Sequence, residues 1–186
     1  MNITQAHPEE APVIAQLIMQ AMTDECCQNL AGADHTLHDF HAMMTLLVSM
    51  DDSQYSYRNT LVARTPEGHV AGICVSYPGA DLHRLRRRFI EQAQRLLGQD
   101  FTDMPDETTE GELYIDSLAV FPQYRGQGIA TTLLHSTIEK AETMSLPAGL
   151  LVDKGNPKAE RLYNKVGFRF VNDTTWAGHE MKHLQK

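Results

Sequence analysis

The spacing of apolar residues changes along the chain, and each change marks the border of a predicted element. Residues 113–120 are rich in aromatic and branched side chains and end at Phe121 and Pro122, as a buried strand would. From Ile129 to Ala141 the apolar residues recur at helical spacing. The sequence therefore predicts a strand that leads through a tight turn into a helix.

Strand-like and helical spacing also alternate over the rest of the chain. The sequence predicts strands near residues 2–6, 60–63, 70–77 and 148–153 and a closing hairpin over 168–184, with helices from Pro8, near 38–48, over 82–97 and over 157–166. Pro66, Glu67 and Gly68 are typical of a hairpin turn. With 186 residues, of which 42% are hydrophobic, these elements suit one domain that spans residues 1–186.

The turn between the strand and the helix contains Arg125, Gly126 and Gly128. Backbone N–H groups at a helix start have no partner within the helix and attract anions, and glycines let a ligand approach closely. From Arg125 to Lys140 the only acidic residue is Glu139, which is far from the helix start. The turn is therefore a candidate phosphate site, although a glycine turn that only reverses the chain would have the same composition.

Two familiar phosphate loops do not fit this turn. A P-loop has a lysine directly after its last glycine, but Gly128 is followed by Ile129. A dinucleotide fingerprint has a third glycine three positions further on, where this chain has Thr131. Neither ATP nor NAD is expected to bind here.

Two segments resemble the GNAT (GCN5-related N-acetyltransferase) superfamily. Gln123, Gly126 and Gly128 match its coenzyme A pyrophosphate loop, Gln-x-x-Gly-x-Gly/Ala after a strand. Asn156 to Phe168 resembles its Asn…Ala…Leu-Tyr…Gly-Phe signature, and Asn156 also suits the N-cap of a helix. The resemblance is strong over residues 112–170, rests on element order before residue 78, and says little about the inserted segment 78–111.

The resemblance implies an α/β fold with a mixed, mainly antiparallel sheet flanked by helices. Two central parallel strands, near 112–120 and 148–153, would splay apart to admit the pantetheine arm. The implied function is an N-acetyltransferase that moves an acetyl group from acetyl-CoA directly to a primary amine of a small molecule or protein, without a metal. The implied coenzyme-binding residues lie at the strand end, the loop and two helix starts: Leu118, Ala119, Val120, Gln123, Arg125, Gly126, Gln127, Gly128, Ile129, Ala130, Thr131 and Asn156.

Within this set, the resemblance assigns the backbone N–H of Leu118 to the oxyanion and places Val120 along the pantetheine arm. It also makes Tyr163 the general acid beside the coenzyme sulfur. A phenol with a pKa of about 10 is a plausible donor to a thiolate whose acid has a pKa of about 8.5. Without the resemblance, Tyr163 shares an apolar helical stripe with Leu162 and Val166 and would be interpreted as a core aromatic.

An amine with a pKa of about 10.4 must lose a proton before it attacks. Glu112 is the first candidate base, because it lies eleven residues before Gln123, where the histone acetyltransferases of the superfamily have a glutamate. Asp116 is the second candidate, and ordered water is a third. Strand alternation places Glu112, Tyr114 and Asp116 on one face. The alternative interpretation of Glu112 is a solvent-facing residue at a strand end.

Charged residues concentrate in two neighbouring segments. Residues 82–97 predict an amphipathic helix with a solvated basic face, and Asp100 to Asp116 contains seven acids and no base. The acids either pair with the arginines or border a site for an amine. The acceptor pocket is expected near residues 24–45, the segment 78–111 and Trp176.

The remaining composition limits the partners. A net charge of −8 argues against a general nucleic-acid binder and is compatible with a cationic acceptor. No apolar run is long enough to span a bilayer and no signal peptide is recognisable, so we expect a cytoplasmic monomer or homodimer. The three cysteines make a poor disulfide framework. The competing function is a non-catalytic acyl-CoA-binding or sensing domain.

Three histidines offer a competing metal hypothesis. His35, His38 and His41 are spaced by three and could gather on a helix. However, Thr36 and Leu37 do not clearly extend that helix back to His35.

Overall fold

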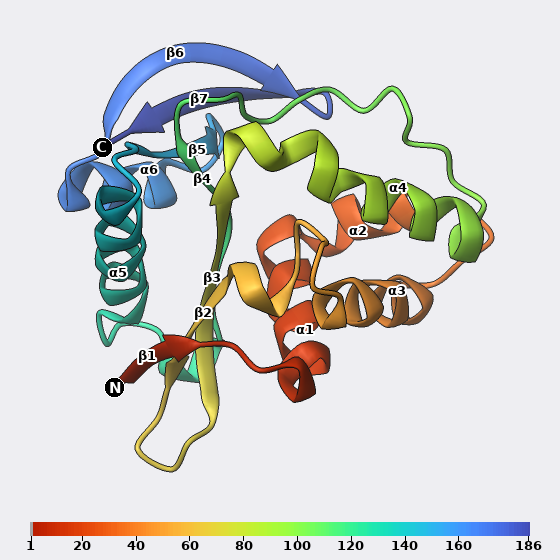
Figure 1. Ribbon diagram of the computed structural model, residues 1–186, viewed down its shortest axis with the longest axis horizontal. Helices are drawn as coiled ribbons and strands as arrows, with labels where there is room; N and C mark the ends of the chain where they lie inside the picture. The colour runs from red at the N-terminus through yellow and green to blue at the C-terminus, as the bar shows by residue number, and fades with distance from the viewer. Residues whose placement is uncertain (1) are drawn as a thin grey trace.

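A mixed β-sheet runs through the computed structural model, which describes residues 2–186 (Figure 1). Its strands are β1 (Asn2–Gln5), β2 (Thr60–Arg64), β3 (Val70–Pro78), β4 (Leu113–Val120), β5 (Ala148–Asp153), β6 (Arg169–Trp176) and β7 (His179–Gln185). They form one seven-stranded sheet in the order β1-β2-β3-β4-β5-β7-β6. Neighbouring strands are antiparallel except for the parallel pair β4 and β5. This confirms the predicted mixed, mainly antiparallel sheet.

Helices cover both faces of this sheet (Figure 1). They are α1 (Ala11–Met22), α2 (Asp24–Ala31), α3 (Leu37–Ser49), α4 (Leu82–Leu97), α5 (Ile129–Thr143) and α6 (Pro157–Val166). Buried residues of α1 to α4 pack in one apolar cluster with inward-facing residues of β2 and β3. Buried residues of α5 and α6 pack in a second cluster against the opposite face. The sheet therefore separates two cores, and its middle strands contact both.

Two helical segments differ from the sequence-based expectation. Pro8 opens a single 3₁₀ turn rather than the helix itself, and α1 begins at Ala11. The helix α2 was not predicted, because it is only eight residues long and faces the core with just Cys27, Leu30 and Ala31. Its start is nevertheless capped, since the Thr23 hydroxyl accepts the N–H of Cys26 at 3.3 Å.

The predicted closing hairpin is confirmed as β6 and β7, which pair from Arg169 with Gln185 to Trp176 with His179. The predicted helix after β5 is also confirmed. The Asn156 side chain caps it by accepting the N–H of Ala159 at 3.1 Å, and Gly167 ends it in the left-handed region with φ 112°. The hairpin completes the sheet, and the helix α6 lies beside α5.

Candidate active site

The parallel strands β4 and β5 pair only at their beginnings. Leu113 lies opposite Ala148 and Tyr114 opposite Gly149, and no further β4–β5 pair follows within residues 2–186. At the other end of β4, the N–H of Phe121 donates to Ala71 of β3 at 2.9 Å. Because successive backbone groups of a strand alternate in direction, the N–H groups of Leu118 and Val120 point away from β3, toward the side where pairing with β5 has ended. The predicted splay therefore leaves backbone donors available along β4.

The loop after β4 presents a second set of backbone donors. Gly126 and Gly128 adopt the left-handed region, with φ 78° and 79°, and a Cβ atom at either would meet nothing within 4 Å. The first backbone hydrogen bond into α5 runs from Thr132 to the Gly128 carbonyl. Within residues 2–186, the N–H groups from Gly126 to Thr131 have no backbone acceptor, and the first turn of α5 contains no acid. The loop therefore fits a diphosphate group.

The side chains of this loop are mostly exposed. Gln123, Arg125 and Gln127 all face solvent. The Arg125 Nε donates to the Val120 carbonyl at 3.0 Å, and Gln20 of α1 donates to the same oxygen at 3.2 Å. These contacts fix the end of β4 relative to the loop. The roles of these side chains toward a coenzyme stay predictions.

Tyr163 lies on α6, partly buried in the cluster beneath α5. Its ring packs edge-on against Phe168, with 6.0 Å between centroids. Its hydroxyl forms no hydrogen bond within the described chain, and burial raises its pKa to about 12, with a smaller contribution from Cys74. Cys74 pairs with Leu118 in the β3–β4 register, so Tyr163 lies on the α5 side of the unpaired part of β4. The group stays protonated at neutral pH and holds a proton that it can donate.

Glu112 comes directly before β4 and is only 3% exposed. The Thr108 hydroxyl donates to its Oε1 at 2.6 Å, while His183 Nε2 and Gln185 Nε2 of β7 contact its Oε2 at 2.7 and 2.8 Å. Burial raises the pKa of Glu112, but the hydrogen bonds from His183, Gln185 and Thr108 outweigh burial, so the net pKa is lowered. The interpretation of Glu112 as a solvent-facing strand-end residue is therefore wrong.

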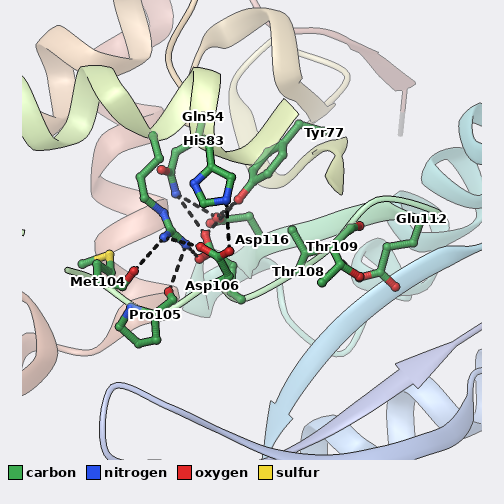
Figure 2. A network of polar contacts seen from close by, with 12 residues as sticks. Gln54, Tyr77, His83, Met104, Pro105, Asp106, Thr108, Thr109, Glu112 and Asp116 are labelled. Atoms are coloured by element: carbon green, nitrogen blue, oxygen red, sulfur yellow. Dashed lines mark hydrogen bonds and ion pairs between the residues drawn. The ribbon is translucent and has the colours of Figure 1, made fainter. Parts of the chain in front are cut away.

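Asp116 lies on the same face as Glu112, where a β-bulge interrupts the register between Val75 and Ser76 of β3 (Figure 2). The residue is partly exposed, but protein atoms surround its carboxyl group. Ser117 Oγ lies 2.8 Å from Oδ1, and Tyr77 Oη lies 3.1 Å from Oδ2. Burial raises its pKa, and hydrogen bonds from these groups offset only part of the rise.

Polar residues that sequence reasoning missed surround Asp116. Arg86 of α4 is 3% exposed and pairs with Glu107, and its Nη1 lies 3.0 Å from Asp106 Oδ1. The prediction of a wholly solvated basic face on α4 is therefore wrong at this position, and one part of the acidic segment pairs with an arginine. A signal was present, because Arg86 falls on the apolar stripe of Leu82 and Phe89.

The histidines are distributed over separate parts of the fold. His35 precedes the N-cap Thr36, and α3 begins at Leu37, as the sequence suggested. Over residues 2–186, no group of three or more His, Cys, Asp or Glu side chains could hold a metal ion. His179 Nδ1 lies 3.0 Å from Asp153 Oδ2.

No helix among the described residues is long and apolar enough to span a membrane.

A splayed parallel strand pair followed by a glycine-containing helix start is the arrangement expected of an acetyltransferase. A model of the GNAT acetyltransferase family matches residues 35–168, and the chain belongs to this family. Members of the family generally use acetyl-CoA as co-substrate. The GNAT membership predicted from the loop and the Asn156–Phe168 signature is therefore confirmed.

Solved structures agree with this assignment. One acetyltransferase structure is 29% identical, with a TM-score of 0.84 and coverage of 100% of this chain and 98% of that chain. An N-acetyltransferase from Staphylococcus aureus Mu50 is 27% identical, with a TM-score of 0.81 and coverage of 100% of both chains. A spermidine/spermine N-acetyltransferase from Vibrio cholerae is 13% identical, with a TM-score of 0.59 and coverage of 100% and 93%, and shows the fold alone. No curated protein matches the chain.

Proposed function

We propose that the protein is an acetyl-CoA-dependent N-acetyltransferase that moves the acetyl group directly to a primary amine of a small molecule or a protein. The splay of β4 from β5, next to the unpaired N–H groups of residues 126–131, is the observation that carries this proposal. Bound acetyl-CoA would supply a diphosphate for these donors and an activated thioester for the acetyl transfer. The Staphylococcus aureus neighbour, an N-acetyltransferase, supports nitrogen as the acceptor atom.

Three groups of the chain carry the chemistry in this proposal. The backbone N–H of Leu118 points into the unpaired side of β4 and would stabilise negative charge on the acetyl oxygen. Tyr163 would protonate the departing thiolate, since its raised pKa keeps the hydroxyl protonated. A carboxylate on the other face would accept the proton of the acceptor ammonium. These three groups lie on both faces of the sheet around one stretch of β4.

Of the two candidate bases, the geometry favours Asp116. Both oxygens of each carboxyl group contact protein donors, but the lowered pKa of Glu112 makes it a weak base. Asp116 lies at the bulge, beyond the last β4–β5 pair, and burial of its carboxyl group raises its pKa. A base whose pKa is closer to the working pH takes a proton more effectively. We therefore assign proton acceptance to Asp116 and a bracing role to Glu112.

The acidic surroundings favour a cationic acceptor. A cavity of about 310 Å³ opens between the start of α4 and the segment before β4. Its lining includes Asp106, Glu110 and Thr108, and the last of these donates to Glu112. The cavity thus lies on the same side of the sheet as the two carboxylates. An ammonium group would be attracted to it at low ionic strength.

Coenzyme binding is tested first by thermal unfolding. Acetyl-CoA should raise the melting temperature while NAD and ATP should not, and saturation at a hundred times the Kd corresponds to about 2.7 kcal/mol. Gly128→Val should abolish the shift, because φ 79° strains a branched residue and the side chain would crowd the phosphates. Gly68→Val is the matched control, since Gly68 has φ 89° and equally open surroundings in a distant turn.

Turnover is tested by following free-thiol release from acetyl-CoA with polyamines, amino acids, aminoglycosides and peptides. At least one amine should accelerate release and appear as its acetyl amide by mass spectrometry. Coenzyme binding without turnover on any amine would instead identify the non-catalytic acyl-CoA-sensing alternative. Equal stabilisation by NAD, or normal binding by a folded Gly128→Val protein, would contradict the assignment of the loop.

A further inference from the structure

A cluster of polar side chains from different elements is buried beside Asp116 (Figure 2). Gln54 comes from the segment between α3 and β2, Tyr77 from β3, Arg86 from α4, and Glu107 from the segment before β4. Gln54 is 3% exposed, Tyr77 0% and Glu107 8%, so water does not replace missing partners freely. The hydrogen-bond donors of this cluster can therefore be counted against its acceptors.

One hydroxyl group lies between two carboxylates. The oxygen of Tyr77 lies 3.0 Å from Glu107 Oε1 and 3.1 Å from Asp116 Oδ2. A phenol has a single proton and can donate to only one of them. The other contact would place two oxygen atoms together without a hydrogen, unless one carboxyl group carries a proton. Gln54 Nε2 lies 3.4 Å from each of the same two oxygens, which is too long for a strong compensating bond.

The surrounding charges lead to the same conclusion. Arg86 pairs with Glu107 and Asp106, and within residues 2–186 no cation forms an ion pair with Asp116. Two like charges that share a buried site cannot both ionise readily. Within residues 2–186, the buried Oε1 of Gln54 and the buried Nε of Arg86 also have no hydrogen-bond partner. The contact of Tyr77 with the two carboxyl groups is therefore short of one hydrogen, and a single added proton would supply it.

We propose that Asp116 and Glu107 share one proton through the Tyr77 hydroxyl, and that this pair, rather than Asp116 alone, receives the proton of the acceptor ammonium. In the one-proton form, the carboxyl group of Asp116 donates to the Tyr77 oxygen, and Tyr77 donates to Glu107. In the proton-free form both carboxylates are ionised. The second half of the proposal rests on the proposed acetyl transfer, whereas the shared proton does not.

The proton transfer balances. One N–H bond of the acceptor ammonium breaks and an O–H bond forms on Asp116, which leaves a neutral amine. Tyr77 then turns its own proton toward Glu107, so the added positive charge is spread over the pair. After the product leaves, the proton passes from Asp116 to solvent, which regenerates the proton-free pair. Glu107 and Tyr77 are thus positioning residues that set the proton affinity of Asp116.

Titratable and charged groups lie near Asp116 on the elements packed against it: Tyr55, Cys74, Tyr77, Arg86, Glu107 and Tyr114. The tyrosines stay protonated, because burial and the charge of Asp116 raise their pKa values. Asp106 is more exposed and contacts Arg86 and His83. Among the acids, Asp106 therefore serves as a control that shares the arginine but does not contact Tyr77.

The test is infrared difference spectroscopy of the C=O stretch of a protonated carboxyl group, at a pH of about 6, where ordinary carboxyl groups are ionised. The wild-type protein should show such a band. Asp116→Asn and Glu107→Gln should each remove it, because either change removes one of the two like charges that hold the proton. Tyr77→Phe should shift its frequency, and Asp106→Asn should leave it unchanged. Melting temperatures confirm that each variant is folded.

Several results would overturn the shared proton. These are no band in the wild-type protein, a band that survives Glu107→Gln, and an equal loss in Asp106→Asn. If one carboxylate variant does not fold, the other together with Tyr77→Phe still decides. A band lost in both carboxylate variants of a protein without acetyl transfer would support the shared proton and reject only the proposed function. In an active enzyme, the band should vanish with rising pH at the midpoint of the acid limb of kcat/KM.

Discussion

Glu112 and Asp116 lie four residues apart on one face of the same part of the chain, yet their surroundings differ in almost every respect. Glu112 lies where β4 is still joined to β5, and donors from β7 hold its carboxylate. Asp116 lies beyond the last β4–β5 pair, at a bulge, where the single hydroxyl of Tyr77 lies between its carboxyl group and that of Glu107. The pKa of Glu112 is lowered, whereas that of Asp116 is raised by burial.

This contrast supports the proposal that one strand separates a bracing carboxylate from a catalytic one. At the closed end, strong hydrogen bonds stabilise the ionised carboxylate and join β4 to β7. At the open end, the strands separate, and a poorly solvated carboxylate gains proton affinity. The predictions below test this division, beginning with the largest effect.

Tyr163→Phe tests whether the open part of β4 is where the chemistry occurs. The ring and its packing on Phe168 remain, so stability should change little. Loss of the general acid should lower kcat by about a hundredfold or more with acetyl-CoA affinity retained. Tyr57→Phe, which removes a surface hydroxyl bonded to Asp51, is the control. Full activity in folded Tyr163→Phe protein would remove the catalytic role.

Glu112→Ala tests the closed end. His183 and Gln185 would lose their shared acceptor, so the free energy of unfolding should fall by about 2–3 kcal/mol. Glu112→Gln keeps an acceptor oxygen and should lose less. Urea unfolding of the two variants measures the difference. If the Glu112→Ala protein is as stable as wild type but inactive, the bracing role is wrong and Glu112 returns as the base.

The pH dependence of the free energy of unfolding should also reveal the lowered pKa of Glu112. The folded-state pKa of Glu112 lies below its unfolded value, so its contribution to stability is complete above the unfolded value of about 4.3. This contribution is lost as the pH falls through the lower folded-state value. Urea midpoints of wild type should therefore drop more steeply below about pH 4.3 than those of Glu112→Gln. Parallel curves would contradict the lowered pKa.

The smallest expected effect concerns the acceptor. If acidic residues such as Asp106 and Glu110 attract a cationic amine, its KM should rise severalfold between low and high salt, because screening weakens the attraction. An amine that has no charged group besides the reacting amine serves as the control. A KM independent of salt for both would identify the acidic segment as ordinary solvated surface.

Much of the fold follows from local patterns. The spacing of apolar residues predicts the strand β4 and the helix α5, and the glycines between them mark the turn. Asn156 and Gly167 mark the two ends of α6. The helix α2 escaped prediction because it is short and has only three core-facing residues, Cys27, Leu30 and Ala31. Its formation depends on packing against α3, which sequence spacing does not reveal.

The candidate site was predicted less completely. The loop residues and Tyr163 came from the family signature, whereas Gln54, Tyr77 and Glu107 have no local signal. Their meeting at Asp116 depends on how separate segments pack, which no spacing rule gives. The preference between Glu112 and Asp116 likewise needed tertiary structure, because His183 and Gln185 lie more than seventy residues away.

The division of β4 into a bracing end and a chemical end is tested most directly by the pH dependence of kcat/KM for the acceptor. Wild type, Asp116→Asn and Glu112→Gln should be measured side by side with one amine. We expect the wild-type rate to fall at low pH, with a midpoint above the ordinary aspartate pKa of about 3.9. Asp116→Asn should lose this limb together with about a hundredfold in rate, and Glu112→Gln should keep it. If Glu112→Gln loses the fall of kcat/KM at low pH and Asp116→Asn keeps it, the account is contradicted.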